Sequence, residues 1–375
     1  MHKPVVICGF KRSPMHFANK GELAKVRPDD MAAEVVKALV DETGVNAEDI
    51  EDLLMGCAFP EAEQGFNIAK LVVQHAELPV SIAGATVNRF CGSSMTSIHI
   101  AAGAIQMGAG DAFICAGVES MSRIPMGGFN PMPNPALYEK YPQAYISMGE
   151  TAENLAKKYE ISRDQQEEFA FGSHHKAAAS AQGGKFDDEI VPIGDVKTDG
   201  TIRPDSSTEK LATLKPAFLE DGTVTAATSS PLTDGSAAVL VCSEEYADKH
   251  KLPKLARIKS VAVAGCKAEI MGIGPVPATQ KALDRAGLKI DDIDIWELNE
   301  AFAAQGLSVL KELGVDVKKV NLDGGAIALG HPLGTSGARI TGKAASLLHR
   351  EKAKYALATM CIGGGQGVAT VLEAI

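Results

Sequence analysis

Residues 44–53 read GVNAEDIEDL, and residues 287–296 read GLKIDDIDIW. The glycine at the start and the Asp-Ile pair in the middle recur at the same places, so the second stretch is displaced by 243 positions (287 − 44). Each stretch follows a segment with helical spacing and leads into an apolar, strand-like segment. A repeat of this kind predicts a duplicated α/β unit.

A second match lies further along the chain. Val87-Asn88 recurs as Val320-Asn321 at a displacement of 233 (320 − 87), so the second copy is shorter by ten residues between the two matches (243 − 233). Either match alone is compatible with chance similarity. Two matches in the same order favour two related halves.

Between the halves the character of the sequence changes. Residues 121–145 are rich in Pro, Gly, Met and Asn without a sustained period, which is typical of a loop, whereas 151–185 contain good helix formers. Such a segment is too long for a connection, so we expect an inserted subdomain. The expected division is an N-terminal half at residues 1–118 plus 233–254, an inserted domain at 119–232, and a C-terminal half at 255–375.

Strand-like and helical segments alternate along both halves. Apolar runs at 5–8, 237–242 and 368–372 predict strands, and residues 244–250 predict a helix. This alternation favours an α/β fold, with parallel strands in sheets that helices cover on both faces.

Composition excludes several classes of function. The chain has 375 residues, 45% of them hydrophobic and 22% charged, which is typical of a globular protein with more than one domain. A formal net charge of −10 provides no basic field for nucleic acid or an anionic membrane, although a few local cations could bind an anionic small molecule. No apolar stretch reaches membrane-spanning length and the N-terminus has no signal character, so a cytoplasmic protein is expected.

The seven cysteines are scattered without CxxC pairs, which argues against a disulfide framework and against a structural zinc site. Most of them are expected to be small buried residues among Val, Ile and Ala. This expectation covers Cys8, Cys115, Cys242 and Cys266.

Cys91 stands in the segment VNRFCGSSM at residues 87–95, where an extended stretch gives way to a helix. That helix, residues 92–107, consists of Ala, Ile, Ser and Gly with hardly a charge, and is expected to be buried. A helix N-terminus favours the thiolate form of a cysteine, so Cys91 is a candidate nucleophile. The alternative is a buried cysteine at the start of a core helix.

A single histidine, His331, lies in the glycine-rich run NLDGGAIALGHPLG at residues 321–334. It could take a thiol proton, and the alternative is a packed core histidine. The adjacent His174 and His175 fall on a polar helix and are expected to be solvated.

Cys361 opens the glycine loop CIGGGQG at residues 361–367, whose N–H groups could face a developing oxyanion. A phosphate loop is the competing interpretation, but no Lys-Ser/Thr follows the glycines. The segment NEAFAA at residues 299–304 adds Asn299, which could orient water or a carbonyl, and Glu300, which could be a structural charge.

Together the segments 87–95, 299–302, 330–332 and 361–363 resemble motifs of the thiolase family, in family order and across essentially the whole chain. The resemblance implies a five-layered αβαβα sandwich of two duplicated halves. It also implies that the insertion is a coenzyme A-binding loop domain.

By this resemblance Cys91 is the acylated nucleophile, His331 its activating base and Cys361 the acid/base. Asn299 would hold a water that, with His331, forms one oxyanion hole. The backbone N–H groups of Cys91 and Gly363 would form the other.

The resemblance also implies that Arg203, Ser230, Met148 and Phe302 bind coenzyme A or the acyl substrate. Arg203 matches an arginine that contacts coenzyme A, and Ser230 matches a serine beside its pantetheine, although a proline follows each of them here. Coenzyme A is then a substrate, and neither a permanently bound cofactor nor a metal is expected.

Within the family, the segments 63–69, 91–95 and 274–278 look most like degradative 3-ketoacyl-CoA thiolases (acetyl-CoA C-acyltransferases). That implies cleavage of 3-ketoacyl-CoA by coenzyme A to acetyl-CoA and a shortened acyl-CoA, through an acyl-cysteine, in fatty-acid β-oxidation. The alternatives are a biosynthetic acetoacetyl-CoA thiolase and a catalytically inactive coenzyme A- or lipid-binding scaffold. Relatives form homodimers or homotetramers, and some bind a multifunctional β-oxidation subunit.

Overall fold

The computed structural model describes residues 3–375, with strands and helices in both halves of the chain. The strands are β1 (Val5–Arg12), β2 (His16–Phe17), β3 (Ile50–Gly56), β4 (Ala83–Val87), β5 (Ala112–Ser120), β6 (Thr233–Ser243), β7 (Ala256–Gly265), β8 (Ile295–Leu298), β9 (Tyr355–Ile362) and β10 (Gln366–Glu373). The helices are α1 (Pro28–Thr43), α2 (Ile68–His75), α3 (Ser93–Met107), α4 (Pro135–Lys140), α5 (Met148–Tyr159), α6 (Arg163–Gln182), α7 (Thr208–Ala212), α8 (Glu244–His250), α9 (Pro275–Ala286), α10 (Ala303–Leu313), α11 (Ala326–Leu329) and α12 (Ser336–Glu351).

Strands of both halves pair into a continuous sheet in the order β4-β3-β5-β6-β1-β7-β10-β9-β8, with β2 beside β6. The halves meet where β1 runs antiparallel to β7, at Val6 opposite Arg257 and Ile7 opposite Ala256. Only this short pairing joins them within the sheet, so each half keeps its own set of strands. The domain boundaries expected from the sequence stay a prediction.

The predicted duplication is confirmed by matching elements. Helices α3 and α12 begin 243 positions apart (336 − 93), and so do strands β5 and β9 (355 − 112). In each half an inner strand pairs in parallel with its outer neighbour, as β5 does with β3 and β9 with β8. The central helices and strands of the two halves are therefore separated by the same 243 positions as the sequence repeat.

The expectation of parallel sheets is wrong in part, because the sheet is mixed. Parallel pairing is confined to the outer strands, β4 with β3, β3 with β5, and β8 with β9. Strands β9 and β10 are joined by a tight glycine turn, and two strands joined so closely must run antiparallel. Strand β6 also runs antiparallel to both β5 and β1.

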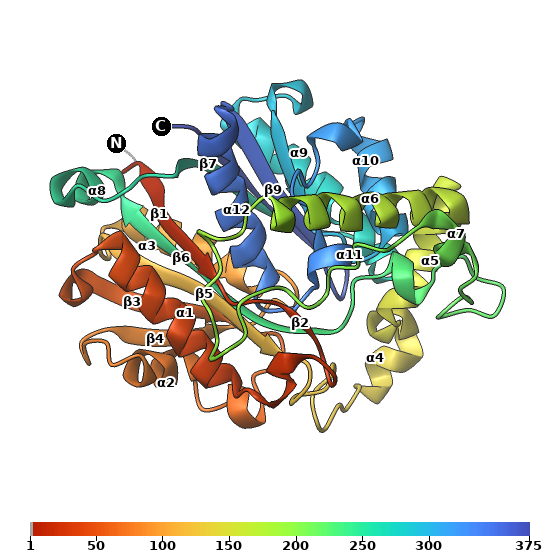
Figure 1. Ribbon diagram of the computed structural model, residues 1–375, viewed down its shortest axis with the longest axis horizontal. Helices are drawn as coiled ribbons and strands as arrows, with labels where there is room; N and C mark the ends of the chain where they lie inside the picture. Colours follow the sequence, from red (N-terminus) through yellow and green to blue (C-terminus); the bar gives the residue numbers. More distant parts are fainter. Residues whose placement is uncertain (1–2) are drawn as a thin grey trace.

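The layers follow the predicted αβαβα order (Figure 1). Helices α1 and α2 share one apolar core with the strands of the N-terminal half, and α9 shares another with those of the C-terminal half. Helices α3 and α12 lie between the two sets of strands and share the central core. The inserted helices lie outside these layers, α5 against α10 and α6 against α11.

Helix α3 is not buried along its whole length, contrary to the expectation from its composition. Its first residues, 93–98, are all buried between the strands and α12. Towards its C-terminal end one side reaches the surface, where Ile100 is 44% and Met107 86% exposed. The lack of charged residues therefore reflects the burial of the first turns of α3, which lie next to Cys91.

The segment 121–145, predicted as a loop, contains helix α4 and a 3-10 turn at Pro142–Tyr145. Asn134 accepts a hydrogen bond from the Leu137 N–H at its N-terminus, and Pro135 occupies the first turn. An Asn-Pro pair is a helix-start signal that the Pro- and Gly-rich composition of the segment obscured.

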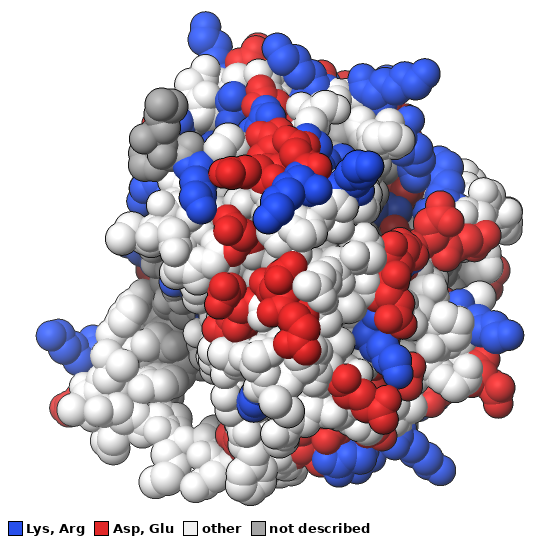
Figure 2. All heavy atoms as spheres, turned by 90° about the vertical axis from the view of Figure 1, so that its left-hand side faces the viewer, with Lys and Arg blue, Asp and Glu red and all other residues white. Residues whose placement is uncertain are grey.

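The surface charge is distributed unevenly. On the face shown in Figure 2, Asp and Glu side chains gather across the middle, and Lys and Arg lie between and around them without forming a continuous basic field. In the described part of the chain, no helix has both the length and the apolar character needed to cross a membrane.

Gly337 lies where α12 crosses α3, and a Cβ atom there would be 2.3 Å from the backbone N of Met95. We expect Gly337→Ala to force the helices apart and to lower the free energy of unfolding in urea by about 1–3 kcal/mol. Gly103→Ala on α3 is the matched control, because nothing lies within 4 Å of its added methyl group. It is expected to stabilise the helix by about 0.5–1 kcal/mol, and equal effects of both changes would contradict the tight crossing.

Candidate active site

Cys91 lies in the turn between β4 and α3, one residue before the N-cap Gly92, and is 9% exposed. Its sulfur is contacted by the backbone N–H groups of Gly363 and of Cys91 itself, which act to lower its pKa. Burial is the larger influence and raises the pKa to about 11. The N–H groups therefore act in the direction expected for this position, but burial outweighs them and Cys91 rests as a protonated thiol.

The turn before Cys91 is held in a strained conformation. Phe90 has a φ of +43°, which is rare for a residue with a bulky side chain. Its N–H donates to Asn88 Oδ1 at 2.9 Å, and its carbonyl accepts from Ser93 Oγ at 2.6 Å. These side chains offset the cost of the strain, which residues at functional sites often carry.

His331 is buried in the loop between α11 and α12. Its Nδ1 lies 2.6 Å from Ser336 Oγ, which is also 3.0 Å from the carbonyl oxygen of Pro332. Because the Ser336 hydroxyl donates to that carbonyl, Nδ1 carries the proton and donates to Ser336. The lone pair of Nε2 then accepts a hydrogen bond from Asn299 Nδ2 at 3.3 Å.

Burial keeps this imidazole neutral. It lowers the pKa of His331 to about 3, and the nearby charge of Arg339 acts in the same direction. A neutral imidazole with an unprotonated Nε2 can accept a proton, which is what a base for a thiol needs.

Asn299 follows strand β8, and its N–H donates to the carbonyl of Thr359 on β9 at 3.0 Å. This places it beside the strand that carries Cys361 two residues further on. Its Oδ1 is buried and has no hydrogen-bond partner among residues 3–375. A buried amide oxygen without a protein partner is a suitable place for an ordered water.

Cys361 is fully buried near the end of β9, and burial raises the pKa of its thiol, with the neighbouring Cys91 acting in the same direction. It packs in an apolar cluster with Phe302 and the half-buried Met148. A Cβ atom on Gly363 would lie 3.6 Å from Met148 Sδ and from the Phe90 ring. The predicted residues of three separate segments therefore converge at one place.

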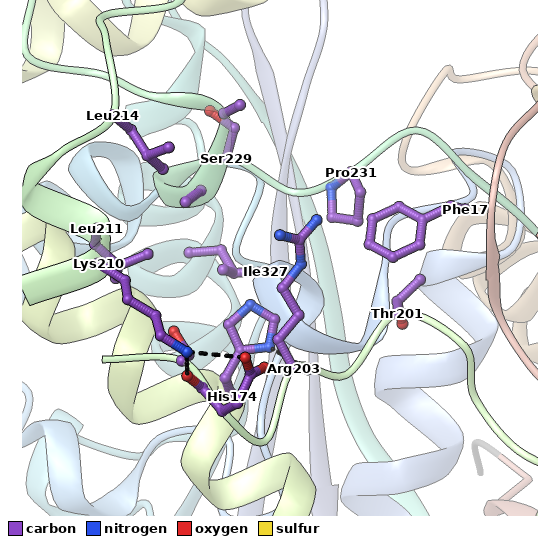
Figure 3. Close-up of a pocket in the computed structure, with 14 residues that line it drawn as sticks. Phe17, His174, Thr201, Arg203, Lys210, Leu211, Leu214, Ser229, Pro231 and Ile327 are labelled. Carbon is purple, nitrogen blue, oxygen red and sulfur yellow. Dashed lines mark hydrogen bonds and ion pairs between the residues drawn. The ribbon is translucent and has the colours of Figure 1, made fainter. Parts of the chain in front are cut away.

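The residues expected to bind coenzyme A fall in different places. Arg203 lines a pocket and lies over the Phe17 ring, 5.2 Å from its centroid. In Figure 3 its guanidinium reaches between Ser229 and Pro231. Ser230 does not line this pocket, and its Oγ donates to the carbonyl of Ala301 at 3.0 Å. Met148 and Phe302 lie instead at Cys361.

His174 contradicts the expectation of a solvated histidine, since it is only 5% exposed and lines the Arg203 pocket. Its helix α6 packs on α11, which covers one side of an otherwise polar helix. Its Nδ1 accepts the backbone N–H of Arg203 at 3.2 Å, and burial lowers its pKa to about 4. Nε2 therefore carries the proton.

Comparison with known proteins agrees with these motifs. Residues 5–245 match the family described as "Thiolase, N-terminal domain", and residues 252–374 match "Thiolase, C-terminal domain". The chain belongs to the thiolase family. The fold and the family expected from the sequence are thus confirmed.

Individual thiolases align along their full length. A 3-ketoacyl-CoA thiolase of Bacillus subtilis is 47% identical, over 99% of each chain. The crystal structure of human mitochondrial 3-ketoacyl-CoA thiolase in complex with CoA is 37% identical with a TM-score of 0.91, covering 100% of this chain and 98% of that one. The acetyl-CoA acetyltransferase of Bacillus anthracis is 39% identical with a TM-score of 0.91, covering 100% and 99%.

Two thiolase site residues were missed by the sequence analysis. Ser336 holds His331 Nδ1, and its signal is a hydroxyl residue at the start of α12, five positions after the histidine. Glu119 lies close enough to Cys91 to raise the pKa of its thiol. Nothing in its own apolar strand distinguishes it except that it is a carboxylate in a buried run.

Buried histidines make the stability of this thiolase fall in mild acid. The pKa of His174 lies near 4 in the folded state and near 6.5 when unfolded, so between these values only the unfolded chain binds the proton. Lowering the pH from 6.5 to 5 should cost about 2 kcal/mol for this residue in urea unfolding. His174→Gln should reduce that loss, whereas the exposed His75→Gln should leave it unchanged; an undiminished loss in His174→Gln would contradict the assignment.

Proposed function

We propose that this chain is a degradative thiolase that acts in the cytoplasm. It cleaves 3-ketoacyl-CoA with coenzyme A, giving acetyl-CoA and an acyl-CoA shortened by two carbons. The observation that carries the proposal is the meeting of Cys91, Cys361 and the Gly363 N–H beside the Asn299–His331 pair. The 3-ketoacyl-CoA thiolases among its relatives support the degradative direction.

In the first half-reaction, Nε2 of His331 takes the proton of the Cys91 thiol. The sulfur attacks the ketone carbon, and its oxygen is held by the N–H groups of Cys91 and Gly363. The carbon–carbon bond then breaks, its electron pair leaves with the acetyl-CoA enolate, and the Cys361 thiol protonates that carbon. The enolate oxygen is stabilised by the protonated His331 and a water on Asn299.

In the second half-reaction, the Cys361 thiolate takes the proton of an incoming coenzyme A thiol. The coenzyme A sulfur attacks the acyl-Cys91 thioester, and the carbon–sulfur bond to Cys91 breaks. His331 returns its proton to the departing Cys91 thiolate, so every group is restored. A thiol is suited to both transfers because its pKa can approach that of the coenzyme A thiol.

The Arg203 pocket suits the nucleotide end of coenzyme A. Arg203, Lys210 and the Nε2–H of His174 provide donors for phosphate oxygens, and Phe17 and Leu214 provide apolar contact. The pocket also includes Ser229, whose backbone bridges to Phe302 beside Cys361. Pantetheine would follow this connection from the pocket to the thiols.

A second candidate is the condensation of two acetyl-CoA molecules. The same groups catalyse this reverse reaction. The similarity to the Bacillus anthracis acetyl-CoA acetyltransferase favours condensation as the second candidate. Comparing thiolysis of acetoacetyl-CoA with that of longer 3-ketoacyl-CoA substrates distinguishes the two. A preference for the longer substrates supports the degradative function, and activity on acetoacetyl-CoA alone contradicts it.

Cys361→Ala separates acylation from turnover. The variant should still form an acyl adduct on Cys91 when mixed with 3-ketoacyl-CoA, detected by mass spectrometry of the intact protein and its peptides. Its steady-state thiolysis should fall about 100-fold or more, because both proton transfers lose their group. Cys242→Ala, which removes a buried thiol from β6, is the control and should retain wild-type turnover. An adduct elsewhere than Cys91 would contradict the mechanism.

A homo-oligomer is also proposed, with β4 at the contact. Among the described strands β4 pairs only with β3, so its other edge offers unpaired backbone groups. Asn67 binds the carbonyl of Gly84 on this strand at 2.7 Å, and the neighbouring Phe66 is 91% exposed. An edge strand beside an exposed aromatic ring is suited to pairing with a second copy of the chain.

Phe66→Asp should therefore shift the protein from dimer or tetramer towards monomer in size-exclusion chromatography with light scattering, because a charge would be buried at the contact. Met107→Asp, at a similarly exposed position on the C-terminal end of α3, should leave the mass unchanged. If both variants keep the wild-type mass, the contact does not lie at β4.

A further inference from the structure

Glu119 is a buried carboxylate at the end of β5 that the proposed reaction does not use. It is 1% exposed, and its Oε2 accepts the backbone N–H of Ala58 and of Gly334, each at 2.8 Å. Its Oε1 accepts from Gln64 Nε2 at 2.8 Å and from the Phe59 N–H at 3.3 Å. Both oxygens are therefore satisfied, mostly by backbone from two separate loops.

The contacts indicate an ionised carboxylate. Every polar partner of Glu119 is a donor, including the Cys57 thiol at 3.7 Å from Oε1, and a protonated carboxyl group would leave its own O–H without an acceptor. No Lys or Arg side chain in residues 3–375 is hydrogen-bonded to it. Burial raises the pKa of this carboxyl group, and its N–H donors act against that rise, so its charge is held by hydrogen bonds rather than by a cation.

The two N–H groups that donate to Oε2 are connected to the loops that carry His331 and Cys91. Gly334 is three residues beyond His331 in the same loop. The carbonyl of Ala58 accepts from Asn88 Nδ2 at 3.0 Å, and Asn88 Oδ1 accepts the N–H of Phe90, the residue before Cys91. Glu119 Oε2 is thus bonded directly to the loop that carries His331, and through Ala58 and Asn88 it is linked to the loop that carries Cys91.

The fit at this point is tight. A Cβ atom on Gly334 would lie 2.7 Å from the carbonyl oxygen of Gly56 and 2.9 Å from Glu119 Oε2. A Cβ atom on Gly117 would lie 2.3 Å from the carbonyl oxygen of Gly334. The loop that carries His331 therefore packs tightly against the ends of β3 and β5, and the Glu119 carboxylate has no room to change its partners.

We propose that Glu119 is a positioning residue, which fixes the His331 loop against the Cys91 loop and places a negative charge near the Cys91 thiol. The positioning part rests on the proposed function. The charge opposes ionisation of Cys91, so the thiol stays protonated until substrate and His331 act together. No contact between Glu119 and the substrate is required.

Several titratable groups surround this carboxylate. Cys57 lies on the adjoining loop, Cys91 before α3, His331 before α12, and Asp234 on β6, where it accepts from Ser120 and Ser122. Glu119 raises the pKa of both Cys57 and Cys91, each of which burial already raises more strongly. Removing its charge should therefore ease ionisation of Cys91.

The test compares Glu119→Gln, which removes the charge and keeps the shape, with Glu119→Asp, which keeps the charge and shortens the reach. The rate of Cys91 alkylation by iodoacetamide is measured against pH by peptide mass spectrometry, beside kcat and KM for thiolysis. Glu119→Gln should lower the alkylation midpoint by about half a pH unit, because the Glu119 charge adds to the larger effect of burial. Glu119→Asp should leave that midpoint near wild type. Both should lower kcat about tenfold or more, with KM for coenzyme A within about twofold.

Glu153→Gln is the matched control, because Glu153 is a buried carboxylate that also accepts backbone N–H groups, those of Thr223 and Val224, but is not among the groups that shift the pKa of Cys91. It should leave the alkylation midpoint unchanged. An equal shift in this control, or a wild-type kcat in either Glu119 variant, would overturn the proposal; if one variant does not fold, the other decides. Alkylation needs no turnover, so a wild-type protein that alkylates but cleaves no 3-ketoacyl-CoA contradicts only the proposed function.

Discussion

The structure depends on how closely the first turns of α3 and α12 approach each other in the central layer. Ala338 donates its N–H to Ser94 Oγ at 2.8 Å, and the position of Gly337 leaves no room for a side chain against Met95. Because α3 begins beside Cys91, and α12 begins a few residues after His331, this approach brings the segments that carry these two residues together from distant parts of the sequence. Backbone contacts between the helices set the separation of the two segments.

Burial determines the resting chemistry of the site. It raises the pKa of Cys91 to about 11 and lowers that of His331 to about 3, so both groups are neutral near pH 7. A neutral pair does not attract the negatively charged ends of a ligand, and its thiol is a poor target for oxidants. The N–H groups of Gly363 and Cys91 point at the sulfur and, within the described part of the chain, are the only groups there that favour negative charge on it.

The sequence predicted those features that local patterns encode. The duplication, the family motifs and the helix at 244–250 follow from spacing and residue type, and in the structure Cys91 neighbours Cys361 and Gly363 while Asn299 contacts His331. Features that depend on contacts between distant segments were missed. The burial of His174 requires α11, and the roles of Ser336 and Glu119 require loops far from them in the chain. The protonated state of Cys91 depends on its burial, which outweighs the effect of the N–H groups at the helix start.

Strand β6 links the two ends of the first half, with consequences for the order of folding. It pairs Val5 with Ser243 and Ala112 with Cys242, so the N-terminal strand finds its partner only after more than two hundred intervening residues. During synthesis, the edges of β1 and β5 that pair with β6 therefore stay unpaired until the insertion and β6 have been made. Pairings so distant in sequence slow folding and leave edges open to aggregation, so assembly of this sheet is the step at which a chaperone would help most.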